Sequence, residues 1–178
     1  MFLERLFRPK PAALAGRRLY DAAANQARTP AFYANLGAPD TMEGRFELYS
    51  LHVILLLDRL KGETDLVEPR QSLFDSYVHG LDDALREIGV ADTSVAKKMK
   101  KLAGAFYGRL RGYDAAFGAL PDQAELAALI GRTLFGEADD SRAAADAASA
   151  AAARTALAGQ GARALVDGAA PAWPPIAP

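Results

Sequence analysis

The chain has 178 residues and carries 21 Lys and Arg residues against 22 Asp and Glu residues, so its formal net charge is −1. This near-balance argues against a histone-like protein that binds polyanions over its whole surface. The absence of cysteine excludes disulfides, thiolate nucleophiles and cysteine-based metal sites. The longest apolar stretch, residues 46–57, is too short to span a bilayer, and no secretory signal is visible at the start. We therefore expect a cytoplasmic protein that is at most peripheral to a membrane.

The composition and the spacing of apolar residues predict an all-α fold. Alanine is abundant, β-branched residues are few, and apolar residues recur with a period near 3.6. In chain order, helices are predicted over residues 11–28, 40–61, 69–88, 92–117 and 121–136.

Helix boundaries are indicated by capping residues and glycines. Asp40 is followed three positions later by Glu, which is a helix-start signal, and Asp92 is expected to cap the helix that follows it. Pro121 suits the first turn of the fifth helix. Gly62 and Gly89 are expected to end the helices before them.

The organisation of the chain changes near residue 137. Residues 138–172 are about half alanine, which favours helix but buries little area, so this tail is expected to be helical without docking firmly. We predict an N-terminal arm over residues 1–10, one helical domain of about five to seven helices over residues 11–137, and an Ala/Pro-rich tail over residues 138–178. The arm carries apolar and basic residues together; it is interpreted either as a disordered start or as a short amphipathic turn at a membrane surface.

Catalytic motifs are absent from the sequence. No phosphate-binding loop, dinucleotide fingerprint, HExxH or GxSxG motif occurs. The histidines, His52 and His79, lie on different predicted helices, and no repeated His–carboxylate pair indicates a metal centre. We therefore expect no catalysis, no metal and no cofactor. A carboxylate-based metal enzyme is the third-ranked alternative.

The helix predicted near residues 43–61 is apolar on two sides, which is typical of a central helix. Arg45, His52 and Arg59 recur every seven residues between those sides and form one polar stripe. Two interpretations stay open for this stripe: a solvated or ion-paired edge, or the lining of a groove for a partner.

The helix predicted over residues 93–117 separates an apolar stripe from a basic face. Residues 92–113 hold six basic residues against one acidic residue. This face is interpreted either as ordinary solvated surface or as a docking site for the phosphates of lipid head groups or RNA. The residues predicted to dock are Lys97, Lys98, Lys100, Lys101 and Arg111.

Several ordered motifs resemble the ubiquinol–cytochrome c chaperone family. They include D-x-x-x-G-R-F-E-L at Asp40–Leu48, L-F-D at Leu73–Asp75, L-R-E-I-G-V at Leu85–Val90, K-K-M-K-K at Lys97–Lys101 and the later F-Y-G-R, together with His52 and the pair Arg59-Leu60. The resemblance covers roughly residues 12–120 and does not reach the alanine-rich tail. Ala91 departs from the family pattern, which has glycine in a G-V-G-D turn.

The resemblance implies an all-helical, non-enzymatic chaperone that binds newly made cytochrome b and promotes assembly of respiratory complex III. It also implies a place at the cytoplasmic or matrix side of the inner membrane, near the ribosomal tunnel exit or an anionic membrane surface, with a small helical partner in mitochondrial members. Under this hypothesis, Arg45, His52 and Arg59 are the candidate client-binding or partner-binding residues. A general ribosome-binding or RNA-binding helical protein, which uses the basic face of residues 97–111, is the alternative.

Overall fold

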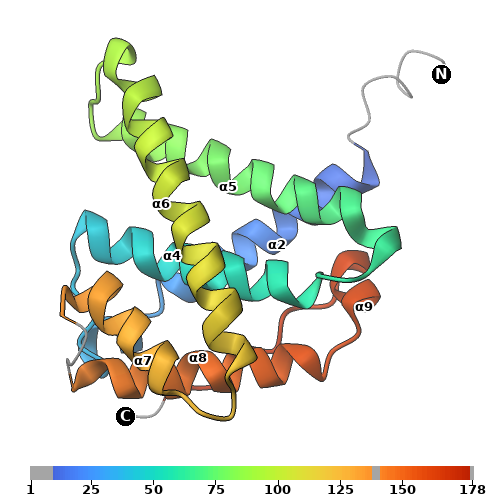
Figure 1. The fold of residues 1–178 in the computed structure, drawn as a ribbon. Helices are drawn as coiled ribbons and strands as arrows, with labels where there is room; N and C mark the ends of the chain where they lie inside the picture. Colours follow the sequence, from blue (N-terminus) through green and yellow to red (C-terminus); the bar gives the residue numbers. More distant parts are fainter. Residues whose placement is uncertain (1–9, 138–140, 177–178) are drawn as a thin grey trace.

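The computed structural model describes residues 10–137 and 141–176, so most of the predicted N-terminal arm lies outside the described residues. The described residues form helices and connecting loops without strands, which confirms the all-α fold. In chain order the elements are α2 (Pro11–Ala27), α3 (Pro30–Ala34), α4 (Met42–Arg59), the 3₁₀ turn η1 (Thr64–Leu66), α5 (Val67–Glu87), α6 (Asp92–Gly118), α7 (Ala124–Ile130), the π-helical turn η2 (Gly131–Phe135), α8 (Arg142–Ala158) and α9 (Ala162–Asp167) (Figure 1).

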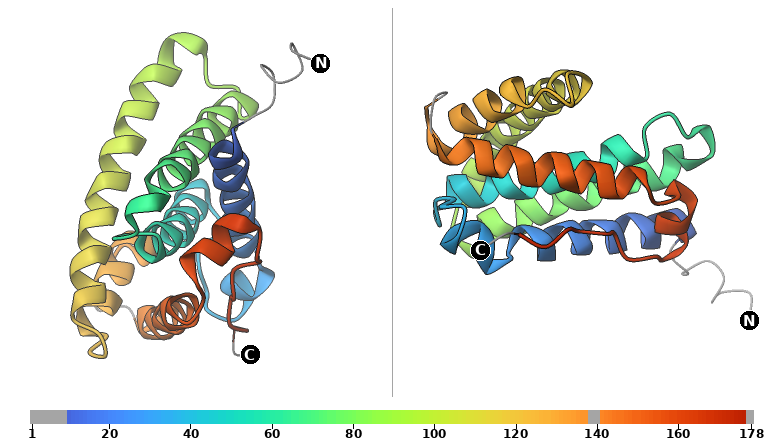
Figure 2. Two further views of the ribbon diagram at one scale, coloured as in Figure 1. Left: turned by 90° about the vertical axis from the view of Figure 1, so that its right-hand side faces the viewer. Right: turned by 90° about the horizontal axis from the view of Figure 1, so that it is seen from below.

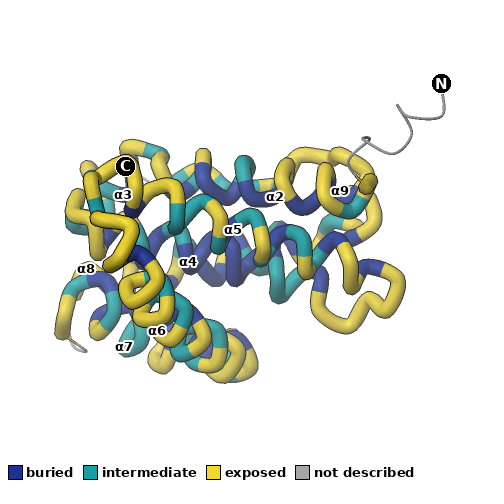
Figure 3. The backbone as a smooth tube through the Cα atoms, turned by 90° about the horizontal axis from the view of Figure 1, so that it is seen from above, coloured by how far each residue is buried: buried dark blue, intermediate teal, exposed yellow. Residues whose placement is uncertain are grey.

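Helix α4 lies at the centre of the molecule, as its two apolar sides predict. Residues 51–56 are all buried, so this part of the helix is covered on every side (Figure 3). Its N-cap is Thr41, whose hydroxyl accepts a hydrogen bond from Gly44 N at 3.1 Å. The predicted cap was Asp40, one residue earlier; the Asp40 carboxylate instead pairs with Arg45 at 2.7 Å.

Helices α2 and α5 pack closely because small residues lie where they meet. A methyl group on Gly16 would come within 2.4 Å of the backbone of Ser72, and one on Gly80 would come within 1.9 Å of the Tyr20 hydroxyl. Gly16 therefore permits a close approach of the two helix backbones that any larger residue would block, and Gly80 leaves room for the Tyr20 side chain.

Helices α5 and α6 form a hairpin whose tip extends beyond the rest of the bundle (Figure 1). Gly89 has a φ of +79°, which agrees with its predicted role after the end of α5. Asp92 is the first residue of α6 rather than its cap, and Ala91 precedes it with an ordinary extended conformation (φ −60°, ψ 139°). Alanine therefore fits at position 91, where the turn requires no glycine.

The predicted fifth helix starts three residues later than Pro121. Asp122 accepts a hydrogen bond from Ala124 N at 2.9 Å, which places the start of α7 at Ala124. The helical path continues through η2 to Gly136, whose φ of +87° ends it close to the predicted position.

The alanine-rich tail packs firmly, which differs from its expected loose docking. In α8, alanines at one-turn spacings are buried against α4 and α7, and α9 contacts α2 (Figure 2). Alanine buries little area per residue, but its small side chain lets helix backbones approach closely, so a whole face of α8 joins the core. The end of an autonomous domain near residue 137 stays a prediction.

Residues 169–176, which we call the C-terminal strap, run back along the bundle after α9 (Figure 2). The side-chain amide of Gln160 binds the strap twice: it donates to Ala170 O at 3.0 Å and accepts from Ala172 N at 2.7 Å. Within the described ranges, no helix is long and apolar enough to cross a membrane.

Candidate functional site

A groove of about 510 Å³ lies between α4, α5 and α6, and we call it the α4–α5–α6 groove. Its volume is in the range typical of sites that receive a ligand or a partner's side chains. Buried or half-buried apolar side chains from the three helices form its floor and walls: Ile54, Leu57, Phe74, Phe106, Leu110 and Phe117.

Aromatic side chains connect the two walls that α5 and α6 contribute. The Phe74 ring lies 5.5 Å from the Phe106 ring and 5.9 Å from the Tyr107 ring, measured between centroids. Phe106 also packs on Tyr77 at 4.7 Å, which ties it to the core. Tyr107 remains 50% exposed at the edge, so it presents a large ring to whatever enters the groove.

The charged residues around the groove fall into two classes. Lys61 forms an ion pair with Asp114, and Asp58 accepts from Arg154 Nε at 2.8 Å. Arg70 and Arg111 also line the groove, but neither has an ion-pair partner among the residues that the structure describes.

The four lysines predicted to dock lie together on the first half of α6. Lys97, Lys98, Lys100 and Lys101 are all exposed near the tip of the α5–α6 hairpin. Arg111 is exposed too, but it lies about 15 Å farther along the helix and belongs to the groove. Arg109, on a flank of the predicted basic face, turns inward and forms a bidentate pair with Glu47 at 2.7 and 2.8 Å.

The structure does not bring Arg45, His52 and Arg59 together on one open surface. Arg45 is exposed and paired with Asp40. Arg59 Nε donates to the carbonyls of Leu157 and Gln160 at 3.0 and 2.8 Å, so it holds the end of α8 against α4. A binding role for the three residues stays a prediction, and the observed contacts of Arg59 are structural.

His52 is buried, with 2% of its surface exposed. Its ring makes edge-on contacts with Phe32 and Trp173, at centroid distances of 5.0 and 5.4 Å, and Nδ1 donates to Leu48 O at 2.7 Å. Burial lowers the pKa of His52 to about 4, against a smaller raising effect of the bond to Leu48, so the ring is neutral at pH 7.

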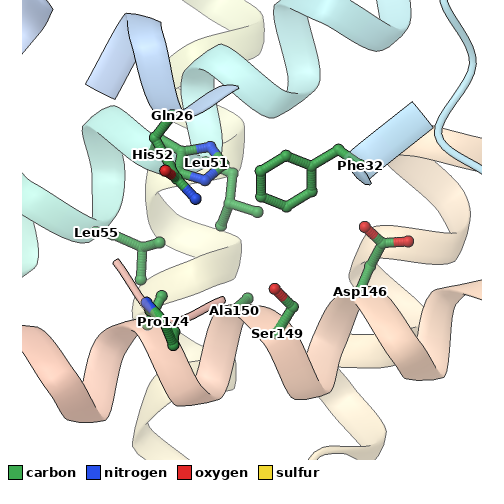
Figure 4. Close-up of a pocket in the computed structure, with 10 residues that line it drawn as sticks. Gln26, Phe32, Leu51, His52, Leu55, Asp146, Ser149, Ala150 and Pro174 are labelled. Carbon is green, nitrogen blue, oxygen red and sulfur yellow. The ribbon is translucent and has the colours of Figure 1, made fainter. Parts of the chain in front are cut away.

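A cavity of about 10 Å³ lies beside His52, with room for about one water molecule. Figure 4 shows Leu51, Leu55 and Ala150 on its walls and Pro174 of the strap at its edge. This cavity is too small for a client or a cofactor. Across the described part of the chain, no three His, Asp or Glu residues gather as a metal site would require.

Comparison with known proteins decides the family. The family model described as ubiquinol–cytochrome C chaperone matches residues 34–173. This chain belongs to the ubiquinol–cytochrome c chaperone family. Its membership makes it a chaperone of complex III assembly, and the match extends past residue 137 through α8 and α9, well beyond the stretch in which the sequence motifs were found.

A solved structure agrees with this assignment. The crystal structure of the Cbp3 homolog from Brucella abortus matches with 37% sequence identity and a TM-score of 0.80, and the match covers 94% of each chain. No curated protein sequence matches the chain.

Sequence reasoning missed the groove, which is built from three helices. Its one visible signal is Tyr107, an aromatic residue that falls off the apolar stripe of α6 and is therefore expected to face outward. Arg70 gave no signal, because its place beside the groove depends on how α5 and α6 pack.

Proposed function

We propose that this chaperone is non-enzymatic, binds newly made cytochrome b during complex III assembly, and receives an apolar part of the client in the α4–α5–α6 groove. The observation that carries the proposal is the groove itself. It is a concavity of about 510 Å³ with an apolar floor and with half-exposed Tyr107 at its edge. Cytochrome b is a membrane protein, so its unassembled segments expose apolar side chains that bury area by entering such a surface.

The family assignment supports cytochrome b as the client, and the shape and apolar lining of the α4–α5–α6 groove support it as the binding site. The cavity beside His52, by contrast, holds about one water molecule and cannot receive a segment of the client. Large exposed apolar residues elsewhere, such as Leu14 and Met42, are scattered singly, as is ordinary for a protein surface.

We propose that the chaperone docks on phosphate groups through the lysines at the tip of the α5–α6 hairpin. Lys97, Lys98, Lys100 and Lys101 point into solvent on a projecting hairpin, which suits contact with the phosphates of a ribosomal tunnel exit or an anionic inner-membrane surface. A small helical partner protein remains part of this proposal. The alternative, general RNA binding by this face without a cytochrome b client, predicts capture of ribosomal RNA with an affinity that falls steeply with salt.

Site-specific crosslinking tests the groove as the client site. A photo-crosslinking amino acid replaces Tyr107 in one variant and Leu14 in a matched control; Leu14 is 47% exposed and does not line the groove. We expect newly made cytochrome b to crosslink at position 107 and not at position 14. Equal crosslinking at both positions, or crosslinking at position 14 alone, contradicts the proposal.

A second measurement tests the consequence in cells. Tyr107→Ser removes a half-exposed ring that contacts Phe74 and Phe106, so the free energy of unfolding should fall by about 1 kcal/mol while the chain stays folded. The amount of assembled complex III should fall in cells that depend on this variant. An unchanged amount of complex III in these cells would contradict a role of Tyr107 in binding the client.

A further inference from the structure

We propose that the α4–α5–α6 groove selects an apolar helical segment that carries carboxylates at one end, and that Arg70 and Arg111 hold those carboxylates. This inference rests on the proposed function and adds to it the chemical class of segment that the groove accepts.

Arg70 on α5 and Arg111 on α6 line the same groove. The two helices are joined as a hairpin, and the Phe74 ring contacts the rings of Phe106 and Tyr107. Arg70 lies one turn before Phe74 on α5, and Arg111 lies one turn after Tyr107 on α6. Both steps lead away from the hairpin tip, so both arginines lie beyond the aromatic contact as seen from the tip.

Neither of these two arginines forms an ion pair within the described residues. Lys61 and Asp114 pair with each other, and Asp58 pairs with Arg154. The nearby Asp75 carboxylate keeps its negative charge but accepts from the Gln71 side chain at 2.8 Å rather than from an arginine. Within the described residues, Arg70 and Arg111 therefore provide two guanidinium groups beside an apolar surface, and a guanidinium binds a carboxylate with two parallel hydrogen bonds.

The lysines of the hairpin tip extend this positive charge. Lys97 and Arg111 are fourteen residues apart and therefore share one side of α6, so this side carries basic residues both at the hairpin tip and at the groove. An acidic segment is attracted along this side, whereas a basic segment is repelled by it. The apolar floor of the groove stabilises a bound segment whose apolar side chains become buried there. A purely acidic polymer has no such side chains.

Binding of designed peptides to the full chain tests the proposal. The probes are helical peptides of about 18 residues, roughly five turns, with leucines along one face and glutamines elsewhere. Three versions end in Glu-Glu, Gln-Gln or Lys-Lys. We expect the Glu-Glu peptide to bind about tenfold more tightly than the Lys-Lys peptide at low salt, and this advantage should shrink as salt rises.

Two variants locate the charge effect. In Arg70→Gln/Arg111→Gln the three peptides should bind within about twofold of one another, since the Glu-Glu advantage has no guanidinium to depend on. Arg132→Gln is the matched control, because Arg132 is exposed and does not line the groove. It should keep the full preference.

The outcomes separate this inference from the proposed function. Equal affinity for the Glu-Glu and Lys-Lys peptides, with both weakened by Tyr107→Ser, overturns the charge preference and keeps the groove. Peptide affinities that Tyr107→Ser leaves unchanged, with no crosslinking of cytochrome b at position 107, overturn the proposed client site itself. If the double variant loses binding to phosphatidylglycerol vesicles while its peptide preference is unchanged, the arginines serve a lipid surface and the inference is wrong.

Discussion

The imidazole of His52 is buried in contact with the rings of Phe32 and Trp173, and this burial makes the free energy of unfolding depend on pH. Folded His52 stays neutral down to about pH 4, whereas an unfolded histidine takes up a proton near pH 6.5. Protonation therefore favours the unfolded state as the pH falls from about 6.5 to 4. We expect His52 alone to lower the free energy of unfolding by about 2 kcal/mol between pH 7 and pH 5.

Urea unfolding at the two pH values measures this effect. His52→Leu should remove most of the His52 contribution, while His79→Leu should leave it intact because His79 is exposed. The same loss of stability in wild type and His52→Leu would mean that other groups cause the pH dependence.

Two arginines a half-turn apart on α6 should differ sharply in their effect on stability. Arg109 forms a bidentate pair with Glu47, whose side chain is 8% exposed, whereas Arg111 has no partner in the described structure. Arg109→Met leaves a buried carboxylate unpaired and should lower the free energy of unfolding by about 3 kcal/mol. Arg111→Met should change it by less than about 0.5 kcal/mol. Thermal and urea unfolding compare the two; similar losses would refute the distinction.

At the scale of single residues, the sequence predicts how side chains are spaced along a helix better than it predicts which other side chains surround them. The seven-residue repeat of Arg45, His52 and Arg59 is real, but the rings around His52 come from residues 32 and 173, far away along the chain. Arg109 and Arg111 look alike in the sequence, and only the position of Glu47 on α4 separates them. Neither relation follows from helical periodicity.

At the scale of helices, replacing a helical glycine by alanine should have opposite effects on the free energy of unfolding at two positions. A methyl group on Gly16 would meet the backbone of α5, so Gly16→Ala must push α2 and α5 apart and should lower the free energy of unfolding by about 2 kcal/mol. Gly104 lies within α6 with open space around it, so Gly104→Ala should raise it by about 0.5–1 kcal/mol through helix propensity. Urea midpoints measure both; a loss in Gly104→Ala would show an unexpected constraint on α6.

Helix boundaries were largely predictable, and helix contacts were not. The first four long helices begin and end within about two residues of their predicted bounds, because glycines and apolar periodicity act locally. The firm packing of α8 was not foreseen, since alanine gives a strong helix signal and a weak burial signal. The groove was also beyond prediction, because it depends on the crossing of three helices.

At the scale of the whole molecule, α8 is expected to be required for a cooperative fold, and the strap is expected to add stability to it. Ala143, Ala147 and Ala150 cover α4 with the rest of α8, and Trp173 covers His52. A chain that ends at residue 137 should therefore expose α4, bind a hydrophobic dye and lose its sharp unfolding transition. A chain that ends at residue 168 should still unfold cooperatively, at lower urea.

Both chains are compared with the full chain by dye fluorescence and urea unfolding. Cooperative unfolding of the chain that ends at 137, with little dye bound, would establish residues 11–137 as an autonomous domain. That result would contradict a requirement for α8 in the core.

The late position of α8 in the chain has a consequence for how the protein is made. Synthesis delivers the leucine-rich α4 early, but its last cover arrives only when residues 142–176 have been translated. Until then, the face of α4 that α8 covers is apolar and exposed, the same kind of surface that the protein is proposed to shield in its client. A chain that ends between α4 and α8 is therefore expected to aggregate more readily than the full chain.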